Sequence, residues 1–355
     1  MKIGVLTYHI DMNPGATLQC YATCRALKEL GHDVFIIDLE HRSEYSSRIR
    51  EIVAKIIQYR SMHRQMKFIH EYFPPFTKHY SDINELRNDP PQLDAYCIGS
   101  DQVWNTKIAG PSHLAYFLDF GDEKVKRFSY ASSIGLSEWP VKDESENKRI
   151  GALLSGYDGL AVREPTAAQL LTEQFGLDAT IVCDPVLLHK DYKELIGTQT
   201  QSGEMACYMF KRPTDVLDAL LKVAKDLGVP ARMVTSLKPI QGFIHTTRKE
   251  VPMWLKYMSS SVFNVTDSFH GTVVSLLYHR PFAVVYKDDG RSSRISDLLK
   301  TAGLENRLFF KVDDFMNSAI WNNAIDWNAV DDRLEAYRAK SWDYLKKTLE
   351  KNLVI

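Results

Sequence analysis

The first forty residues alternate between strand and helix patterns, and this alternation constrains the fold more than any other feature. A strand pattern from Ile3 to Tyr8 is followed by a loop through Asn13-Pro14-Gly15 and a helix pattern from Ala16 to Leu30. A second strand pattern, Asp33 to Asp38, follows Gly31. Such a unit requires parallel strands covered by helices, so we expect a doubly wound α/β sheet with ligands outside the carboxyl ends of its strands.

The alternation repeats along the chain and predicts two consecutive α/β domains with a cleft between them. Asp184-Pro185 marks a crossover, because proline disfavours helix in the residue before it. The 355 residues also suit two domains of about 150 residues each. We expect an N-terminal domain over 1–180, a C-terminal domain over 181–329, and a final helix over 330–355 that packs back across both.

Charge and hydropathy exclude several classes of protein. The 44 Lys and Arg residues nearly balance the 45 Asp and Glu residues, which argues against nucleic acid as a partner. No stretch approaches the roughly 20 apolar residues that a membrane-spanning helix needs. The N-terminus enters a strand pattern directly, and the five scattered cysteines form no paired motif. We therefore expect a cytoplasmic protein with reduced thiols.

One segment stands apart from this pattern. Arg48 to Phe68 reads as one long amphipathic helix, in which Glu51 is the only acid before Lys67. A basic amphipathic helix can lie on an anionic membrane surface. A helix packed on the core with a basic solvated face gives the same pattern, so both interpretations remain open.

Two clusters of polar residues follow predicted strands. Asp101 lies in Gly99 to Asn105 and is a candidate general base, although a residue there can equally cap a helix. Arg163 stands at a strand end beside a predicted helix N-terminus, an arrangement that suits a carboxylate or phosphate. The alternative is a surface pair between Arg163 and Glu164.

Two further clusters lie in the second half of the chain. Asp267, Ser268 and His270 share one turn within Thr266 to Thr272, and a histidine there can exchange a proton near neutral pH or simply hydrogen-bond within the turn. The absence of a Gly-x-Ser-x-Gly motif argues against a serine hydrolase. The loop Asp289 to Arg294 supplies two arginines, which form either a second anion site or a solvated pair.

Motifs for common cofactors are missing from the sequence. It contains neither glycine-rich nucleotide-binding motif, and no pair of residues offers an obvious metal cage. We therefore expect no metal and no bound cofactor.

Five segments together resemble the polysaccharide pyruvyl transferase family. They are Asn13 to Gln19, Gly99 to Asn105, Ser129 to Gly135, Val162 to Glu164 and Thr266 to Thr272. A later segment, Arg291 to Leu299, is similar to the closing motif of the family, and the resemblance extends to about Leu308. Pro14 departs from the family, which commonly has an aromatic residue before the glycine.

The resemblance implies two Rossmann-like domains in a GT-B-like arrangement with an interdomain cleft, with the acceptor on the side of the N-terminal domain and the donor on the side of the C-terminal domain. It also implies a reaction in which phosphoenolpyruvate, as co-substrate, gives its three-carbon unit to two hydroxyls of one sugar. The products are a cyclic pyruvate ketal and phosphate, and the acceptor is expected to be a lipid-linked glycan for bacterial surface polysaccharide or capsule. The basic helix Arg48 to Phe68 would then hold the enzyme peripherally against the inner membrane face. Two alternatives are a glycosyltransferase that uses a nucleotide sugar and a non-catalytic sugar-binding member.

On this resemblance we assign roles to the candidate residues. His270 is the general acid that protonates the methylene carbon, and Asp101 is the base for the incoming hydroxyl. The donor would be bound by Arg163, Ser268, Gly271, Thr272, Arg291 and Arg294. The acceptor would be bound by Gly15, Gln19, Gln102, Trp104 and Asn105.

Overall fold

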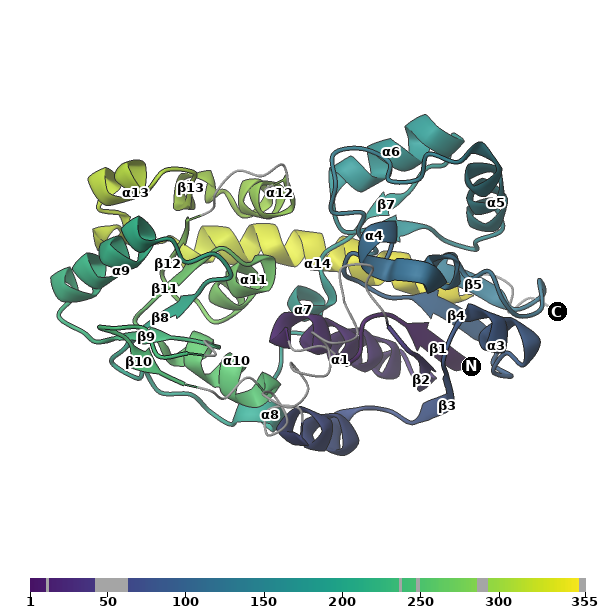
Figure 1. Ribbon diagram of the computed structural model, residues 1–355, viewed down its shortest axis with the longest axis horizontal. Coiled ribbons are helices and arrows are strands. Elements are labelled where there is room, and N and C mark those ends of the chain that lie inside the picture. Colours follow the sequence, from purple (N-terminus) through teal and green to yellow (C-terminus); the bar gives the residue numbers. More distant parts are fainter. Residues whose placement is uncertain (11–12, 42–62, 236–237, 247–249, 286–292, 351–355) are drawn as a thin grey trace.

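A computed structural model describes residues 1–10, 13–41, 63–235, 238–246, 250–285 and 293–350. It contains two α/β units, each built on its own sheet (Figure 1). Every strand pairing within the two sheets is parallel, which confirms the doubly wound α/β class predicted from the alternating pattern.

The sheet of the first unit has five strands in the order β3-β2-β1-β4-β5. Their bounds are β1 (Lys2–Leu6), β2 (Asp33–Leu39), β3 (Phe76–Tyr80), β4 (Ala95–Ile98) and β5 (Lys126–Ser129). The strand order reverses between β1 and β4, the place where a doubly wound sheet opens a crevice for ligands. A short pair, β6 (Ala161–Val162) and β7 (Thr180–Ile181), continues from β5 through bridges to Gly159 and Val162.

The second sheet has six strands in the order β10-β9-β8-β11-β12-β13. Their bounds are β8 (Met205–Tyr208), β9 (Ala231–Met233), β10 (Ile244–His245), β11 (Phe263–Thr266), β12 (Phe282–Val285) and β13 (Leu308–Phe309). Its strand order reverses between β8 and β11, so each sheet has its own switch point.

Two helices that begin at the switch points carry clear start signals. In α1 (Pro14–Glu29) the Asn13 side chain accepts the amide of Gly15, and proline occupies the first helical position. In α11 (Phe269–Leu277) the side chain of Ser268 accepts the amide of Gly271. These caps fix where each helix starts, next to the strand that precedes it.

The remaining helices cover the two sheets and their connections. Those of the first half are α3 (Ile83–Asn88), α4 (Thr106–Ala109), α5 (Glu144–Ser155), α6 (Pro165–Phe175), α7 (Pro185–Leu188), α8 (Lys193–Ile196) and a described helical stretch over 63–72. Those of the second half are α9 (Thr214–Asp226), α10 (Val251–Ser260), α12 (Ser293–Ala302) and α13 (Val312–Ser318). Short 3-10 turns occur at Gly110–Phe117, Glu305–Arg307 and Ile320–Asn322.

The C-terminal helix α14 (Trp327–Glu350) runs between the two units (Figure 1). Its first half lies beside α12, while the Tyr337 hydroxyl donates to the carbonyl of Val182. Near its end the Tyr344 hydroxyl donates to the carbonyl of Ser129, the last residue of β5. One helix therefore contacts both units and limits how far they can move apart.

Buried apolar side chains form three clusters. One cluster lies within the first unit and another within the second. The largest cluster includes side chains of α1, α7, α10 and α11, where the two units meet. All five cysteines are buried and form no disulfide, as predicted. Within the part of the chain that the structure describes, no helix has the length and apolar character to cross a membrane.

Candidate functional site

Loops from both units line one cavity of about 250 Å³. The first unit contributes Asn13, Asp101 and Gln102, which follow β1 and β4. The second unit contributes residues that follow β8 and β11 or lie on α12: Phe210, Lys211, Asp267, Ser268, Phe269, His270, Arg294 and Ile295. The switch points of the two sheets therefore meet in a single cleft.

His270 is held between the two units. It is 5% exposed and sits on the first turn of α11, where its Nδ1 edge faces the backbone of Gly15 in α1. A Cβ atom at residue 15 would lie 2.5 Å from that Nδ1, so the contact requires glycine. On its other edge, Nε2 lies 3.6 Å from Oδ2 of Asp184. That Nε2 makes no hydrogen bond to any described residue.

Asp184 connects the buried polar groups behind the cleft. Its Oδ2 accepts hydrogen bonds from Arg163 at 2.8 Å and from the Ser100 hydroxyl at 3.1 Å, and its Oδ1 accepts the amide of Val186. Burial by itself would raise the pKa of this carboxyl. The neighbouring His270 and Arg163 outweigh burial and hold the pKa well below its usual range, so Asp184 is a carboxylate.

Asp184 is not among the site residues predicted from sequence. The pattern marked it only as a crossover before Pro185, because one acid before an apolar helix gives no sign of its spatial partners. The signal that points to it is its position: a lone carboxyl between Val182 and the fully buried α7 must find a polar partner.

Arg163 is buried rather than exposed, so the interpretation as a surface pair with Glu164 is wrong. Besides the bond to Asp184, it lies 3.9 Å from a carboxylate oxygen of Asp101 and 3.8 Å from one of Glu164. Burial lowers the pKa of the guanidinium, but the three carboxylates outweigh this effect and raise it. Its Nε and one terminal nitrogen have no hydrogen-bond partner among the described residues, and the side chain lines a second cavity of about 240 Å³.

Asp101 has a strained backbone and lines the cleft. Its φ of 76° lies in the left-handed region, which is uncommon for a residue with a Cβ. Its side chain accepts the amide of Gln102 at 2.8 Å. The alternative that Asp101 caps a helix is wrong, since α4 begins at Thr106 with Asn105 before it. Backbone strain of this kind gathers at functional sites.

The turn before α11 uses most of its polar groups internally. Ser268 Oγ accepts the amide of Gly271, and the Ser268 carbonyl accepts both the amide and the hydroxyl of Thr272. The predicted donor contacts of Gly271 and Thr272 therefore need correction, because these donors are already used within the turn. The first amides of a helix have no partner within it, which leaves those of Phe269 and His270 at the cleft.

Asp267 holds the loop that follows β8. Its two carboxylate oxygens accept the amides of Phe210 and Lys211, each at 2.8 Å. Burial raises the pKa of Asp267, although these two backbone bonds oppose the rise. The carboxyl group thereby fixes the backbone from which the Phe210 and Lys211 side chains project.

The predicted acceptor residues divide between cleft and core. Gln102 lines the cleft, and Gly15 lies against His270. Trp104 is fully buried, donates its indole N–H to the carbonyl of Tyr116 and stacks on Phe117, so its prediction as a ligand contact is corrected. Two others are buried as well: Gln19, which donates to Thr7 and Tyr8, and Asn105.

The two arginines predicted as donor contacts in the segment Asp289 to Arg294 have different outcomes. Arg294 lines both cavities, whereas Arg291 lies outside the described residues. Among described residues, no three His, Cys, Asp or Glu side chains gather as metal ligands would.

Part of the predicted basic helix is also described. Residues 48–62 lie outside the described chain, and the helical stretch 63–72 packs on both units. There, Arg64 pairs with Glu250 at 3.0 Å, Gln65 donates to Thr17, and Phe68 is buried. This end of the segment thus packs on the core.

Comparison with known proteins identifies the family. A model of the polysaccharide pyruvyl transferase family matches residues 13–289. None of the curated proteins matches the sequence.

Solved structures share the fold at low sequence identity. The UDP-GlcNAc 2-epimerase from Neisseria meningitidis, bound to UDP-GlcNAc, is 13% identical with a TM-score of 0.55, covering 99% of this chain and 100% of its own. The corresponding epimerase from Rickettsia bellii is 10% identical with a TM-score of 0.56, covering 99% and 96%. The Glycyrrhiza uralensis protein UGT73P12, complexed with glycyrrhetinic acid 3-O-monoglucuronide, is 10% identical with a TM-score of 0.57, covering 99% and 95%. These neighbours confirm the GT-B-like arrangement of two Rossmann-like domains.

Proposed function

The chain belongs to the polysaccharide pyruvyl transferase family, and we propose that it transfers the three-carbon unit of phosphoenolpyruvate to two hydroxyls of one sugar. The observation that carries this proposal is the buried row of His270, Asp184 and Arg163 behind the interdomain cleft. This row combines His270, which can transfer a proton, with the permanent positive charge of Arg163. Transfer from phosphoenolpyruvate requires a proton for the methylene carbon and a cation for the anionic groups.

The reaction balances with groups from the two substrates alone. One sugar oxygen bonds to C2 of phosphoenolpyruvate, while the methylene carbon gains a proton and becomes a methyl group. The second sugar oxygen then bonds to the same C2 as the bond from C2 to the phosphate oxygen breaks. Of the two hydroxyl protons, one offsets the proton taken up by the methyl group and the other leaves with phosphate.

We assign His270 as the acid that protonates the methylene carbon. The carboxylate of Asp184, 3.6 Å from Nε2, stabilises the positive charge of the protonated ring. Asp184 thus acts through His270 as a positioning residue, while Asp101 lies across the cleft as the base for the incoming hydroxyl.

The donor anion would be held by Arg163 and the start of α11. The two nitrogens of Arg163 that make no hydrogen bond to a described residue can bind carboxylate or phosphate oxygens. The amides of Phe269 and His270 add the partial positive charge of a helix N-terminus. Arg294 lines the second cavity together with Arg163, and it also lines the cleft.

The test is to incubate the purified protein with phosphoenolpyruvate and glycan acceptors and to measure phosphate together with the ketal methyl signal by NMR. We expect both products from the unmodified protein, and neither from His270→Ala, which should keep its fold by circular dichroism. Near-normal turnover in His270→Ala would remove this residue from the mechanism. Release of a nucleoside diphosphate from a nucleotide sugar would instead show glycosyl transfer.

We further propose a lipid-linked acceptor at the inner membrane face, bound with help from the basic segment 48–68. Liposome flotation with anionic and neutral vesicles tests this proposal. Charge reversal at Lys67, which is exposed, and at Arg60 should weaken flotation with anionic vesicles. Reversal at Arg64 is not suitable, because it would also break the pair with Glu250. If both charge-reversal variants float with anionic vesicles as well as the unmodified protein does, the basic segment does not bind the membrane through these charges.

A further inference from the structure

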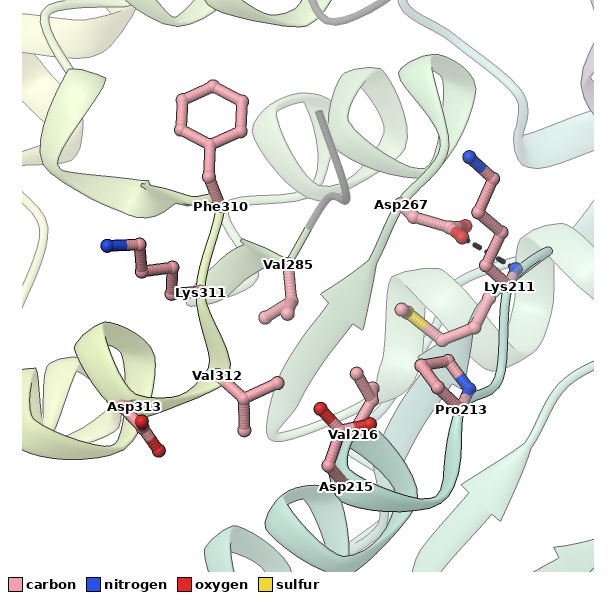
Figure 2. A pocket seen from close by; sticks show the side chains of 11 residues that line it. Lys211, Pro213, Asp215, Val216, Asp267, Val285, Phe310, Lys311, Val312 and Asp313 are labelled. Atoms are coloured by element: carbon pink, nitrogen blue, oxygen red, sulfur yellow. Dashed lines mark hydrogen bonds between the residues drawn. The ribbon is translucent and has the colours of Figure 1, made fainter. Parts of the chain in front are cut away.

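A larger cavity of about 440 Å³ lies beside the cleft, at the carboxyl edge of the second sheet (Figure 2). It is bounded by the segments that follow β8 and β13, by Asp267 after β11 and by Val285, the last residue of β12. The two cavities share Lys211 and Asp267, so they adjoin each other. None of the roles assigned above uses this larger cavity.

The cavity combines an apolar centre with a polar rim. Three valines surround its centre in Figure 2: Val216, Val285 and Val312. Phe310 and Lys211 stand on opposite sides of its upper rim, and Asp215 and Asp313 lie along its lower side. A pocket of this size and composition is typical of a small-ligand site.

Exposed aromatic side chains mark the same region. In the described chain, only three large hydrophobic side chains are strongly exposed, namely Ile10, Phe210 and Phe310. Phe310 is 47% exposed at the larger cavity, and Phe210 is 57% exposed at the cleft. Since Asp267 fixes the backbone at Phe210, that ring is presented to ligands at little conformational cost.

The charges on the rim decide what kind of ligand fits. Asp215 and Asp313 each lie in the first turn of a helix, α9 and α13, where their carboxylates offset the positive potential of the helix end. Among the described residues that line the cavity, Asp215, Asp313 and Asp267 outnumber Lys211 and Lys311, which disfavours a diphosphate. The rim suits a neutral ligand with many hydroxyls, because carboxylates accept from hydroxyls and lysines donate to them.

We propose that this cavity binds a sugar ring of the acceptor, next to the sugar that is modified in the cleft. The apolar C–H face of a pyranose would pack on Phe310 and the valines, and its hydroxyls would reach Asp215 and Asp313. The acceptor would then cross from the cleft over Lys211 and past Phe210 into the cavity. This inference rests on the proposed function, and it makes the enzyme prefer an oligosaccharide to a single sugar.

The test measures binding separately from turnover. The purified protein is applied to immobilised mono-, di- and trisaccharides of hexoses and N-acetylhexosamines, without phosphoenolpyruvate. We expect at least tenfold tighter binding of a di- or trisaccharide than of its terminal monosaccharide. Phe310→Ala and Asp313→Ala should remove this preference, whereas Phe310→Tyr should keep it. Asp314→Ala is the matched control, because Asp314 is the next residue of α13 but does not line the cavity.

Three results would overturn the inference: no glycan binding, equal binding of short and long glycans, or an unchanged preference in Phe310→Ala. Binding of UDP that is lost in Phe310→Ala would also overturn it, since the occupant would then be a nucleotide. Phosphate release from phosphoenolpyruvate is assayed with the same glycans. Turnover without a length preference would reject only the sugar subsite, and a length preference without turnover would reject only the pyruvyl transfer.

Discussion

The imidazole of His270 lies 3.6 Å from the carboxylate of Asp184. His270 lies on α11 of the second unit, and Asp184 is the N-cap residue of α7. The same carboxylate oxygen binds Arg163 at 2.8 Å. One buried anion thus contacts both the proposed proton donor and the proposed donor-binding cation. Its charge should matter to the activity of the enzyme and also to the stability of the fold.

We expect Asp184→Asn to reduce kcat about 100-fold or more, the order expected when general acid catalysis is lost. Asparagine keeps the shape of the side chain but cannot stabilise a protonated His270. Steady-state kinetics over a range of pH should show a smaller change in KM for phosphoenolpyruvate than in kcat, and a basic limb of the kcat profile displaced to lower pH, because a general acid must be protonated to act. Asp184→Glu, which keeps the charge, should recover part of the activity. An unaltered pH profile in Asp184→Asn would mean that Asp184 has only a structural role.

Asp184 also predicts how stability depends on pH. Because its folded-state pKa lies below the value of about 3.9 in an unfolded chain, the unfolded state binds the proton more tightly. The stability that Asp184 contributes is therefore fully present above that value. It is lost as the pH falls below about 4 towards the lower pKa of the folded state.

The measurement is urea unfolding at pH 7 and at pH 3.5 for the unmodified protein and Asp184→Asn. The variant should be less stable at pH 7 by about 3–5 kcal/mol, the cost typical of removing one partner from a buried ion pair. The difference between the two proteins should shrink at the acidic pH. A constant difference would show that Asp184 does not titrate in this range.

The fold follows from local patterns, whereas the site depends on contacts between distant residues. The strand at Ile3, the helix from Ala16 and the turn at Thr266 are predictable because apolar periodicity and capping residues act within a few positions. The link between Asp184 and His270 joins residues 86 positions apart (270 − 184), and no local pattern encodes it. The prediction that Trp104 contacts a ligand was wrong because no local pattern encodes the contacts that bury it. Its place after a strand suggested the cleft, but its burial depends on packing against Phe117.

Gly15→Ala should lower kcat/KM at least tenfold with little loss of stability. The added methyl group would lie 2.5 Å from His270 Nδ1, so either the histidine or the start of α1 must move. Misplacement of a catalytic group by about 1 Å can cost about 100-fold in rate. Gly156→Ala is the matched control. Its new Cβ would lie 3.4 Å from the nearest atom, the carbonyl oxygen of Leu153, and Gly156 does not line the cleft. Full activity in Gly15→Ala would show that the contact with His270 is not needed.

Trp104→Ala separates a core role from a ligand-binding role. The indole is fully buried and stacks on Phe117, so its removal leaves a large cavity beneath the cleft loop. We expect the free energy of unfolding to fall by about 3–5 kcal/mol, as for other buried aromatic residues. Trp104→Phe should lose less, since the ring stacking survives and only the bond to the Tyr116 carbonyl is lost. If Trp104 only packs, Trp104→Phe will leave KM for the glycan acceptor unchanged. A large rise in that KM without a loss of stability would instead return Trp104 to the acceptor site.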